Sequence, residues 1–334
     1  MLPHRKSFRF PCAAMTAGQN REDLEMKDRQ KKIRAKLWQD RQLYLFLILP
    51  VIYIIIFAYV PMSGLAMAFT DYSARKGIFG SDWIGLDNFK RFFESYQSIR
   101  IIFNTIILSV YDIVAGFPIP ICFALILNSL RREKFKKFAQ SVVNLPHFIS
   151  VTVMVGILFQ LLNSRTGLYG MLGEMLTGNY PPDLFGSPSG FRHLYVWSGV
   201  WQEFGWGSVI YTAALSSVDP VYHEAAQIDG ASRFQRIIHI DLPSILPTIV
   251  ICLILRMGSV MSIGFEKVFL MQNGLNLSAS NVISTYVYQI GLSATGNSDF
   301  SFATAVGMFN SVVNLIMIAI TNKIAGKIGD TTLW

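Results

Sequence analysis

The sequence predicts an all-α integral membrane protein with six transmembrane helices. Of the 334 residues, 52% are hydrophobic and only 15% are charged, a composition far from that of soluble proteins. Six apolar runs are each long enough to cross about 30 Å of hydrocarbon at about 1.5 Å per residue. Lys and Arg residues gather in alternate connecting segments, as is typical of multi-pass membrane proteins.

The segment before the first span, residues 1–42, is polar and basic, and we expect it to be cytoplasmic and partly disordered. Residues 1–25 differ in character from the rest of the chain, and Met15 and Met26 are alternative starts. Residues 26–41 are compatible either with a helix at the anionic inner leaflet or with a solvated tail. The next apolar run is too long for a signal-peptide core, so we expect it to remain as the first span.

We place the spans at residues 43–68, 101–127, 142–162, 194–216, 245–270 and 302–321, with a tail at 322–334. Several contain Pro or Gly, which membrane helices tolerate when neighbouring helices satisfy the freed backbone groups. Twenty Lys and Arg residues lie in the amino-terminal segment, the loop 128–141, the loop 217–244 and the tail, against seven in the opposite connecting segments. By the positive-inside rule, both termini and the 217–244 loop are expected to be cytoplasmic.

The 217–244 loop predicts two helices separated by a hinge. Asp219 is a good N-cap before Pro220, which suits the first helical position, and Gly230 can take the left-handed conformation that closes a helix. Ser232 and Gln235 then stand in the relation of a capping box that begins a second helix. The signals at Asp219 and Gly230 together predict a short helix over residues 220–229.

The middle of this short helix carries only methyl-sized side chains, at Ala225 and Ala226. Such a helix can enter a groove on another protein, while Glu224 and Asp229 offer acceptors at its rim. His223 and Glu224 begin an H-E-x-x-H zinc motif, but Gln227 stands at the fifth position, so a metalloprotease is not indicated.

The sequence contains no phosphate-binding loop of the G-x-x-x-x-G-K-[ST] type, so the chain cannot hydrolyse ATP by that route. The five histidines are scattered, no Ser-His-Asp arrangement can be built from the spacing, and the three cysteines indicate no disulfide framework. We therefore expect a protein that is not an enzyme and that binds no cofactor or metal.

Three charged residues are expected near the middle of the bilayer. At about 1.5 Å per residue, Arg256 lies about 18 Å, Asp112 about 17 Å and Glu203 about 14 Å inside their spans. A charge at that depth normally faces a bundle interior or a water-filled cavity. We expect Glu203 and Arg256 to approach each other beside a transport pathway, and Glu266 and Lys267 to lie nearer the outer surface.

The residues expected along this pathway are charged, amide or aromatic, the side chains that bind sugars by hydrogen bonds and stacking: Asp112, Trp201, Gln202, Glu203, Trp206, Arg256, Asn310 and Asn314. Three alternatives stay open. Trp in a membrane helix often serves packing or lipid anchoring, Asn often joins helices, and a buried ion pair can simply fix helix register.

The 217–244 loop fits the spacing E-A-A, three residues, G, nine residues, I-x-L-P at every fixed position: Glu224, Ala225, Ala226, Gly230, Ile240, Leu242 and Pro243. With this spacing, the loop resembles the docking loop of permease subunits in binding-protein-dependent ABC importers. The sequence is also similar to permeases of carbohydrate importers, in the branch that takes up alginate and other complex sugars. This similarity lies in the segments 59–72, 83–93, 201–220, 264–271 and 302–316.

This resemblance implies a type I importer permease, with 43–321 as the transmembrane domain and 217–244 as its coupling loop. It implies that an ATPase docks on Glu224, Ala225, Ala226, Asp229, Gly230, Arg233 and Phe234. The implied partners are a second related permease, two copies of a cytosolic ABC ATPase that bind ATP and Mg, and an extracytoplasmic solute-binding protein. The chain would sit in the bacterial cytoplasmic membrane and pass an oligosaccharide or polysaccharide fragment inward by alternating access.

Two other classes compete with this interpretation. An ion-coupled secondary transporter should show inverted repeats, broken helices and a paired acid site. A membrane-embedded enzyme of lipid-linked sugars should show carboxylates or histidines clustered at one interface. We detect neither pattern in the sequence.

Overall fold

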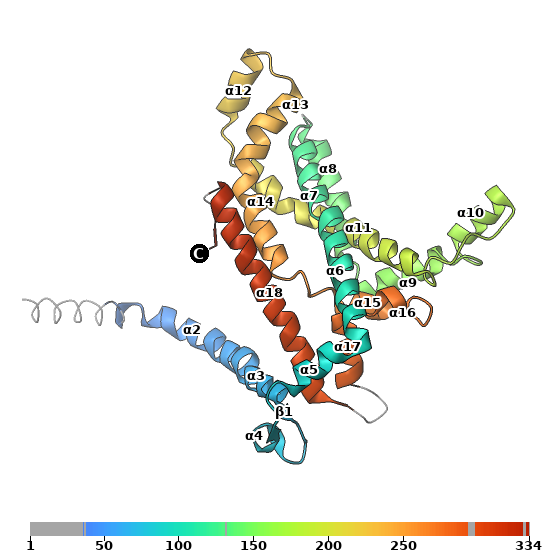
Figure 1. Cartoon of the computed structure of the whole chain (residues 1–334). Helices are drawn as coiled ribbons and strands as arrows, with labels where there is room; N and C mark the ends of the chain where they lie inside the picture. Colours follow the sequence, from blue (N-terminus) through green and yellow to red (C-terminus); the bar gives the residue numbers. More distant parts are fainter. Residues whose placement is uncertain (1–35, 37, 131, 293–297, 330–331, 334) are drawn as a thin grey trace, which may run out of the picture. The chain divides into compact units, whose positions relative to one another are not determined.

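A computed structural model of the chain describes residues 36, 38–130, 132–292, 298–329 and 332–333. The chain divides into two compact units, residues 1–64 and 65–334, each of which is described by itself. The prediction for residues 1–25 lies outside the described residues, and the prediction for 26–41 lies almost wholly outside them. The regular elements of these described residues are helices, apart from one short hairpin (Figure 1).

The first unit contains most of the first expected span, 43–68. Helix α2 (Arg41–Ile54) continues through a π-helical turn, η1 (Ile55–Tyr59), into α3 (Val60–Met62). A 3-10 segment, η2 (Ser63–Phe69), comes next. None of the residues of α2, η1 or α3 is buried, and the run 41–69 is long and apolar enough to cross a membrane. Such a surface suits lipid or another apolar partner.

The second unit begins with small elements that precede the second span. Strand β1 (Thr70–Asp71) pairs antiparallel with β2 (Asp82–Trp83), with Thr70 opposite Trp83. Helix α4 (Gly77–Gly80) lies between the strands, and α5 (Asp87–Glu94) comes after them. The buried amide of Asn88 donates to the backbone oxygens of Ala68 and Thr70, which fixes α5 against this hairpin.

Within the part of the chain that the structure describes, four helical segments are long and apolar enough to span a membrane: 41–69, 96–128, 233–257 and 300–327. The second is formed by α6 (Tyr96–Gly116) and α7 (Pro118–Asn128), and the fourth belongs to α18 (Phe300–Gly329). They correspond to four of the six expected spans. The other two differ from the expectation in shape or in composition.

The third expected span, 142–162, is not a continuous helix. Helix α8 (Glu133–Asn144) and the 3-10 turn η3 (Leu145–Phe148) are followed by α9 (Val151–Leu161) after a bend of 94°. Pro146 stands in the turn, and the Ser150 hydroxyl accepts from the backbone nitrogen of Val153 to begin α9 anew. The two helices count as a fifth span only if the bent pair is taken as one.

The fourth expected span lies in α11 (Pro188–Leu215), a helix of 28 residues. Its length is about 42 Å at the usual rise, yet polar and small residues interrupt its apolar sequence and it is not among the candidate spans of the described chain. Helix α10 (Leu168–Thr177) precedes it. Six continuous spans are therefore not confirmed.

After α11 the chain forms α12 (Pro220–Ile228), α13 (Arg233–Arg236), a π-helical turn η4 (Ile237–Asp241) and α14 (Leu242–Met257). The expected span 245–270 is wrong in its second half, because the helix stops at Met257. A non-helical segment then continues until α15 (Phe265–Met271) begins. The short helices α16 (Leu277–Ser280) and α17 (Ile283–Gly291) precede α18.

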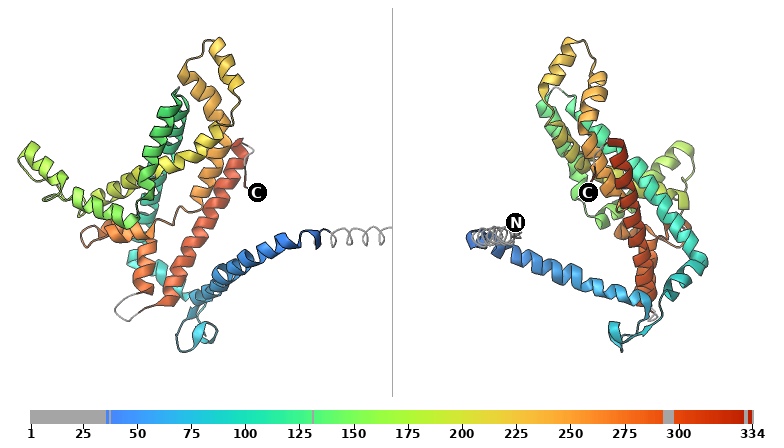
Figure 2. Two further views of the ribbon diagram at one scale, coloured as in Figure 1. Left: turned by 180° about the vertical axis from the view of Figure 1, so that it is seen from behind. Right: turned by 60° about the vertical axis from the view of Figure 1, so that its left-hand side comes forward.

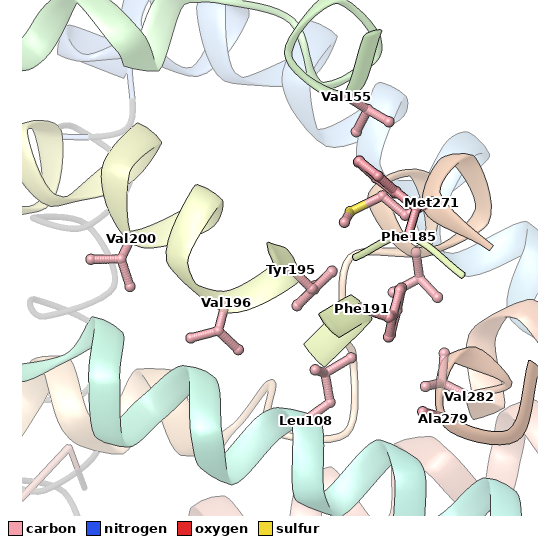
Figure 3. Packing of buried hydrophobic residues seen from close by; sticks show 11 residues of the cluster. Leu108, Val155, Phe185, Phe191, Tyr195, Val196, Val200, Met271, Ala279 and Val282 are labelled. Carbon is pink, nitrogen blue, oxygen red and sulfur yellow. The ribbon is translucent and has the colours of Figure 1, made fainter. Parts of the chain in front are cut away.

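Helix α11 lies at the centre of the second unit and packs against α6, α7, α8, α14 and α16. Its approach to α8 depends on Gly205, where a Cβ atom would lie 2.2 Å from the backbone oxygen of Val143. Figure 3 shows the largest core cluster, in which Leu108 of α6, Phe191 and Tyr195 of α11 and Met271 of α15 converge. This packing holds α15 beside α11, although the sequence between α14 and α15 is not helical.

Candidate functional site: the 217–244 loop and a partly polar cavity

The α12–α13 hairpin stands at one end of the second unit, far from α5 and α17 at the other (Figures 1 and 2). The predicted helix boundaries in it are confirmed. The Asp219 carboxylate accepts from the backbone nitrogen of Val221 at 2.9 Å, and Gly230 ends the first helix with φ of +78°. Ser232 and Gln235 form the expected capping box.

The surface of this hairpin is open and partly apolar. Ile228 is 87% exposed and Phe234 is 70% exposed, and Val221 and Tyr222 are exposed as well. The candidate docking residues Glu224, Ala225, Asp229, Gly230 and Arg233 are also exposed, while Ala226 is half-buried. Large apolar side chains on a loop that is otherwise polar mark an interaction surface.

The sequence did not indicate how α12 is attached to the spans. Nε2 of His223 lies 3.2 Å from Oδ1 of Asp241 in η4, and Nδ2 of Asn128, the last residue of α7, donates to the same oxygen at 3.2 Å. The Asp241 side chain is buried. A buried carboxylate requires such partners, so these contacts fasten α12 to the ends of two spans.

A cavity of about 670 Å³ lies between α6, α7, α11, α14 and α15. The charged residues in its wall are Asp112, Glu203, Arg256, Glu266 and Lys267. Polar groups without formal charge, among them Ser109, Tyr195, Gln202 and Tyr211, share the wall with apolar side chains. A cavity of this size, with a few polar and charged groups in a partly apolar wall, is a candidate ligand site.

The expected approach of Glu203 to Arg256 is not the pairing in the structure. Arg256 forms an ion pair with Asp112 of α6, and the Glu203 carboxylate lies 3.0 Å from Nδ1 of His147 in η3. Depth along a helix placed these charges near one level, but the rotation of each helix about its axis decides which side chains meet. All three expected charges nevertheless face the same cavity.

Lys267 was expected near the outer surface, but it is buried and lines the cavity. Its ammonium donates to the backbone oxygen of Tyr195 at 2.7 Å and lies 4.7 Å from the centre of the Tyr195 ring. Gly199 leaves room for this group, since a Cβ there would lie 3.0 Å from Nζ. The neighbouring Glu266 accepts from the Thr152 hydroxyl at 3.0 Å.

Half of the residues expected along the pathway line the cavity, namely Asp112, Gln202, Glu203 and Arg256. Gln202 also donates to the backbone oxygen of Ile149. The rest do not line it. Trp201 belongs to a separate, apolar pocket beside Leu158 and Trp197, and Trp206 stacks on the His147 ring with centroids 4.6 Å apart.

The two asparagines of α18 lie elsewhere. The Asn314 side chain accepts from the backbone nitrogen of Met261 and donates to the Ser262 hydroxyl, both at 2.8 Å. It thereby holds the non-helical segment after α14. The buried Oδ1 of Asn310 has no hydrogen-bond partner among the residues that the structure describes.

Comparison with known proteins gives a family match and relatives of nearly the same length. Residues 98–329 match the family described as "Binding-protein-dependent transport system inner membrane component". Protein LplB of Bacillus subtilis (strain 168) is 42% identical over 300 residues, which is 90% of this chain and 93% of that protein. A second relative in the same organism is the polygalacturonan/rhamnogalacturonan transport system permease protein YteP. It is 39% identical over 308 residues, which is 92% of this chain and 95% of that protein.

Two solved structures are also similar. One is a bacterial ABC transporter involved in the import of the acidic polysaccharide alginate, with a TM-score of 0.81 and 36% identity over 89% of this chain and 99% of that chain. The other is a bacterial alginate ABC transporter in complex with an alginate pentasaccharide-bound periplasmic protein. Its TM-score is 0.80, with 37% identity over 89% of this chain and 98% of that chain.

Proposed function

We propose that this chain moves an oligosaccharide or polysaccharide fragment into the cytoplasm. The premise is that the chain belongs to the inner membrane components of binding-protein-dependent transport systems. As a permease subunit of an ABC importer, it leaves ATP hydrolysis to partner subunits. Relatives named for polygalacturonan and alginate support the sugar class. The partly polar cavity between the helices supports a polar cargo.

The observation that carries this proposal is the combination of an exposed coupling hairpin with a partly polar cavity in the same helical unit. Alternating access driven by ATP requires both parts, because the site must open to one side of the membrane at a time and a partner ATPase must drive that exchange. The α12 helix offers the motor a surface. Helices α6, α7, α11 and α14 form the walls that would move.

The complete importer would hold a second, related permease, two ABC ATPase subunits and an extracytoplasmic solute-binding protein. ATP and Mg would bind on the ATPase subunits. The solved neighbour with its sugar-bound periplasmic protein supports the last of these partners. The charge distribution of the sequence supports an orientation with both termini and the α12–α13 hairpin in the cytoplasm.

The test is reconstitution of the chain with these partners in liposomes. Uronate-containing and neutral oligosaccharides are offered with the binding protein, and both ATP turnover and sugar uptake are measured. We expect uptake that requires ATP and the binding protein. Uptake driven by an ion gradient in the absence of the ATPase would contradict the proposal and favour a secondary transporter.

A further inference from the structure

The attachment of α12 to the membrane helices depends on one face of that helix. Only His223 and Ala226, three residues apart and therefore on one side, are half-buried, and the remaining residues of α12 are exposed. Ala226 has no polar side chain. His223 supplies a polar contact from this half-buried side of α12 to the rest of the bundle.

The acceptor of that contact, Oδ1 of Asp241, connects α12, α7 and η4. Oδ1 of Asp241 lies 3.2 Å from His223 of α12 and 3.2 Å from Asn128 of α7, while Asp241 itself stands directly before α14. Only 3% of the Asp241 residue is exposed. A charge held in so little solvent keeps its partners close.

The helices that meet at this carboxylate also form the wall of the cavity. Pro120 of α7 and Cys252 and Arg256 of α14 line it. A displacement of Asp241 would therefore move α7 and α14, two walls of the cavity, together. The chain after α12 turns at Gly230, which has a left-handed backbone, and it reaches α14 only after α13 and η4. The contact between His223 and Asp241 is therefore a more direct connection from α12 to α14 than the chain itself.

We propose that His223 and Asp241 form the joint through which movement of α12 reaches α7 and α14, so that His223 is a positioning residue of the transport cycle. The proposal rests on the proposed function, because only a docked ATPase would move α12. The H-E-x-x-H resemblance at this histidine has no part in it. Among the described residues there is no group of three or more His, Cys, Asp or Glu side chains that could hold a metal.

The experiment compares three variants in the reconstituted importer: His223→Ala, His223→Gln and the control His239→Ala. His239 is exposed on the same loop, and its ring forms a hydrogen bond to the backbone oxygen of Gln235 at 2.9 Å. Sugar uptake and ATP hydrolysis are measured together, and their ratio is the readout. A purely structural role would lower the amount of assembled complex but leave that ratio unchanged.

We expect His223→Ala to lower the ratio of sugar taken up per ATP by about tenfold, the factor that loss of one contact to a charged group typically produces. His223→Gln, which keeps an N–H donor, should restore most of it, and His239→Ala should match the unmodified chain. An assembled His223→Ala complex with an unchanged ratio would overturn the joint. Absence of ATP-dependent uptake by the unmodified chain would instead overturn the proposed function.

One further variant tests the joint if His223→Ala does not assemble. Asn128→Ala removes the contact to the same carboxylate from the side of α7 and leaves the α12 surface intact. We expect a lowered ratio of uptake to ATP hydrolysis. An unchanged ratio in Asn128→Ala would overturn the joint whatever the result for His223→Ala.

Discussion

Asp112 of α6 and Arg256 of α14 form an ion pair in the wall of the cavity. Their side chains are 27% and 48% exposed, respectively, in the isolated chain, so the pair lies at the cavity surface rather than in the packed core. It joins two helices that are far apart in the sequence. Loss of one partner would leave the other charge in a low-dielectric wall.

The pair should be measurable as an energetic coupling. Asp112→Asn alone should destabilise the purified chain more than the double variant Asp112→Asn/Arg256→Gln, because the double variant leaves no unpaired cation. We expect a coupling of about 1–2 kcal/mol, between the values for surface and buried pairs. Thermal unfolding of the four members of the cycle in detergent gives this value, and additive effects would show that the two side chains act independently.

Close approach of α8 and α11 at Gly205 gives a second prediction. Gly205→Ala would place a methyl group 2.2 Å from the Val143 oxygen, and we expect a loss of several kcal/mol as the helices separate. The control is Gly307→Ala in α18, where the added Cβ would meet no described atom within 4 Å outside the adjoining backbone of its own helix. That change should stabilise by about 0.5–1 kcal/mol through helix propensity. Equal melting temperatures for both variants would contradict the tight contact.

The hinge at Gly230 gives a third prediction. Proline is fixed near φ of about −65°, whereas Gly230 has φ of +78°. Gly230→Pro should therefore insert into the membrane in normal amount yet hydrolyse ATP without sugar uptake. Gly230→Asn, which tolerates the left-handed region, should keep most of the uptake. Normal uptake by Gly230→Pro would argue against α12 as a lever.

The acidic rim of the coupling helix gives a fourth prediction. Glu224 is exposed on α12, and Glu224→Lys should weaken association with the ATPase by reversing one charge at the docking surface. Glu133→Lys makes the same change at an exposed position of α8, outside the coupling loop, and should have no such effect. Co-purification of the ATPase with each variant measures the difference, and equal recovery would remove Glu224 from the interface.

The coupling loop could be predicted from the sequence almost residue by residue. Its signals are local, because the cap at Asp219, the left-handed Gly230 and the capping box at Ser232 act within a few residues of where they stand. Composition also predicted an apolar helical chain. What composition could not show was the continuity of each helix, which fails at the bend before Val151 and after Met257.

The cavity could be predicted only in part, because its contacts are not local. Counting residues placed Asp112 and Arg256 at similar depth but did not give the rotation of their helices. For the same reason Trp201 was expected in the pathway although it faces a separate pocket. The position of Lys267 in the cavity wall was not predicted. The chain breaks after α14 and brings α15 against Tyr195, and no pattern in the sequence indicates this change of direction.

The central claim is that α12 is the surface on which an ATPase acts. The most direct measurement places a photo-crosslinking amino acid at Ala225, which is exposed in the middle of α12, and identifies the cross-linked product in the assembled importer. We predict a covalent adduct with the ATPase subunit whose yield changes when ATP is added. An adduct only with lipid or with the extracytoplasmic binding protein would contradict the account.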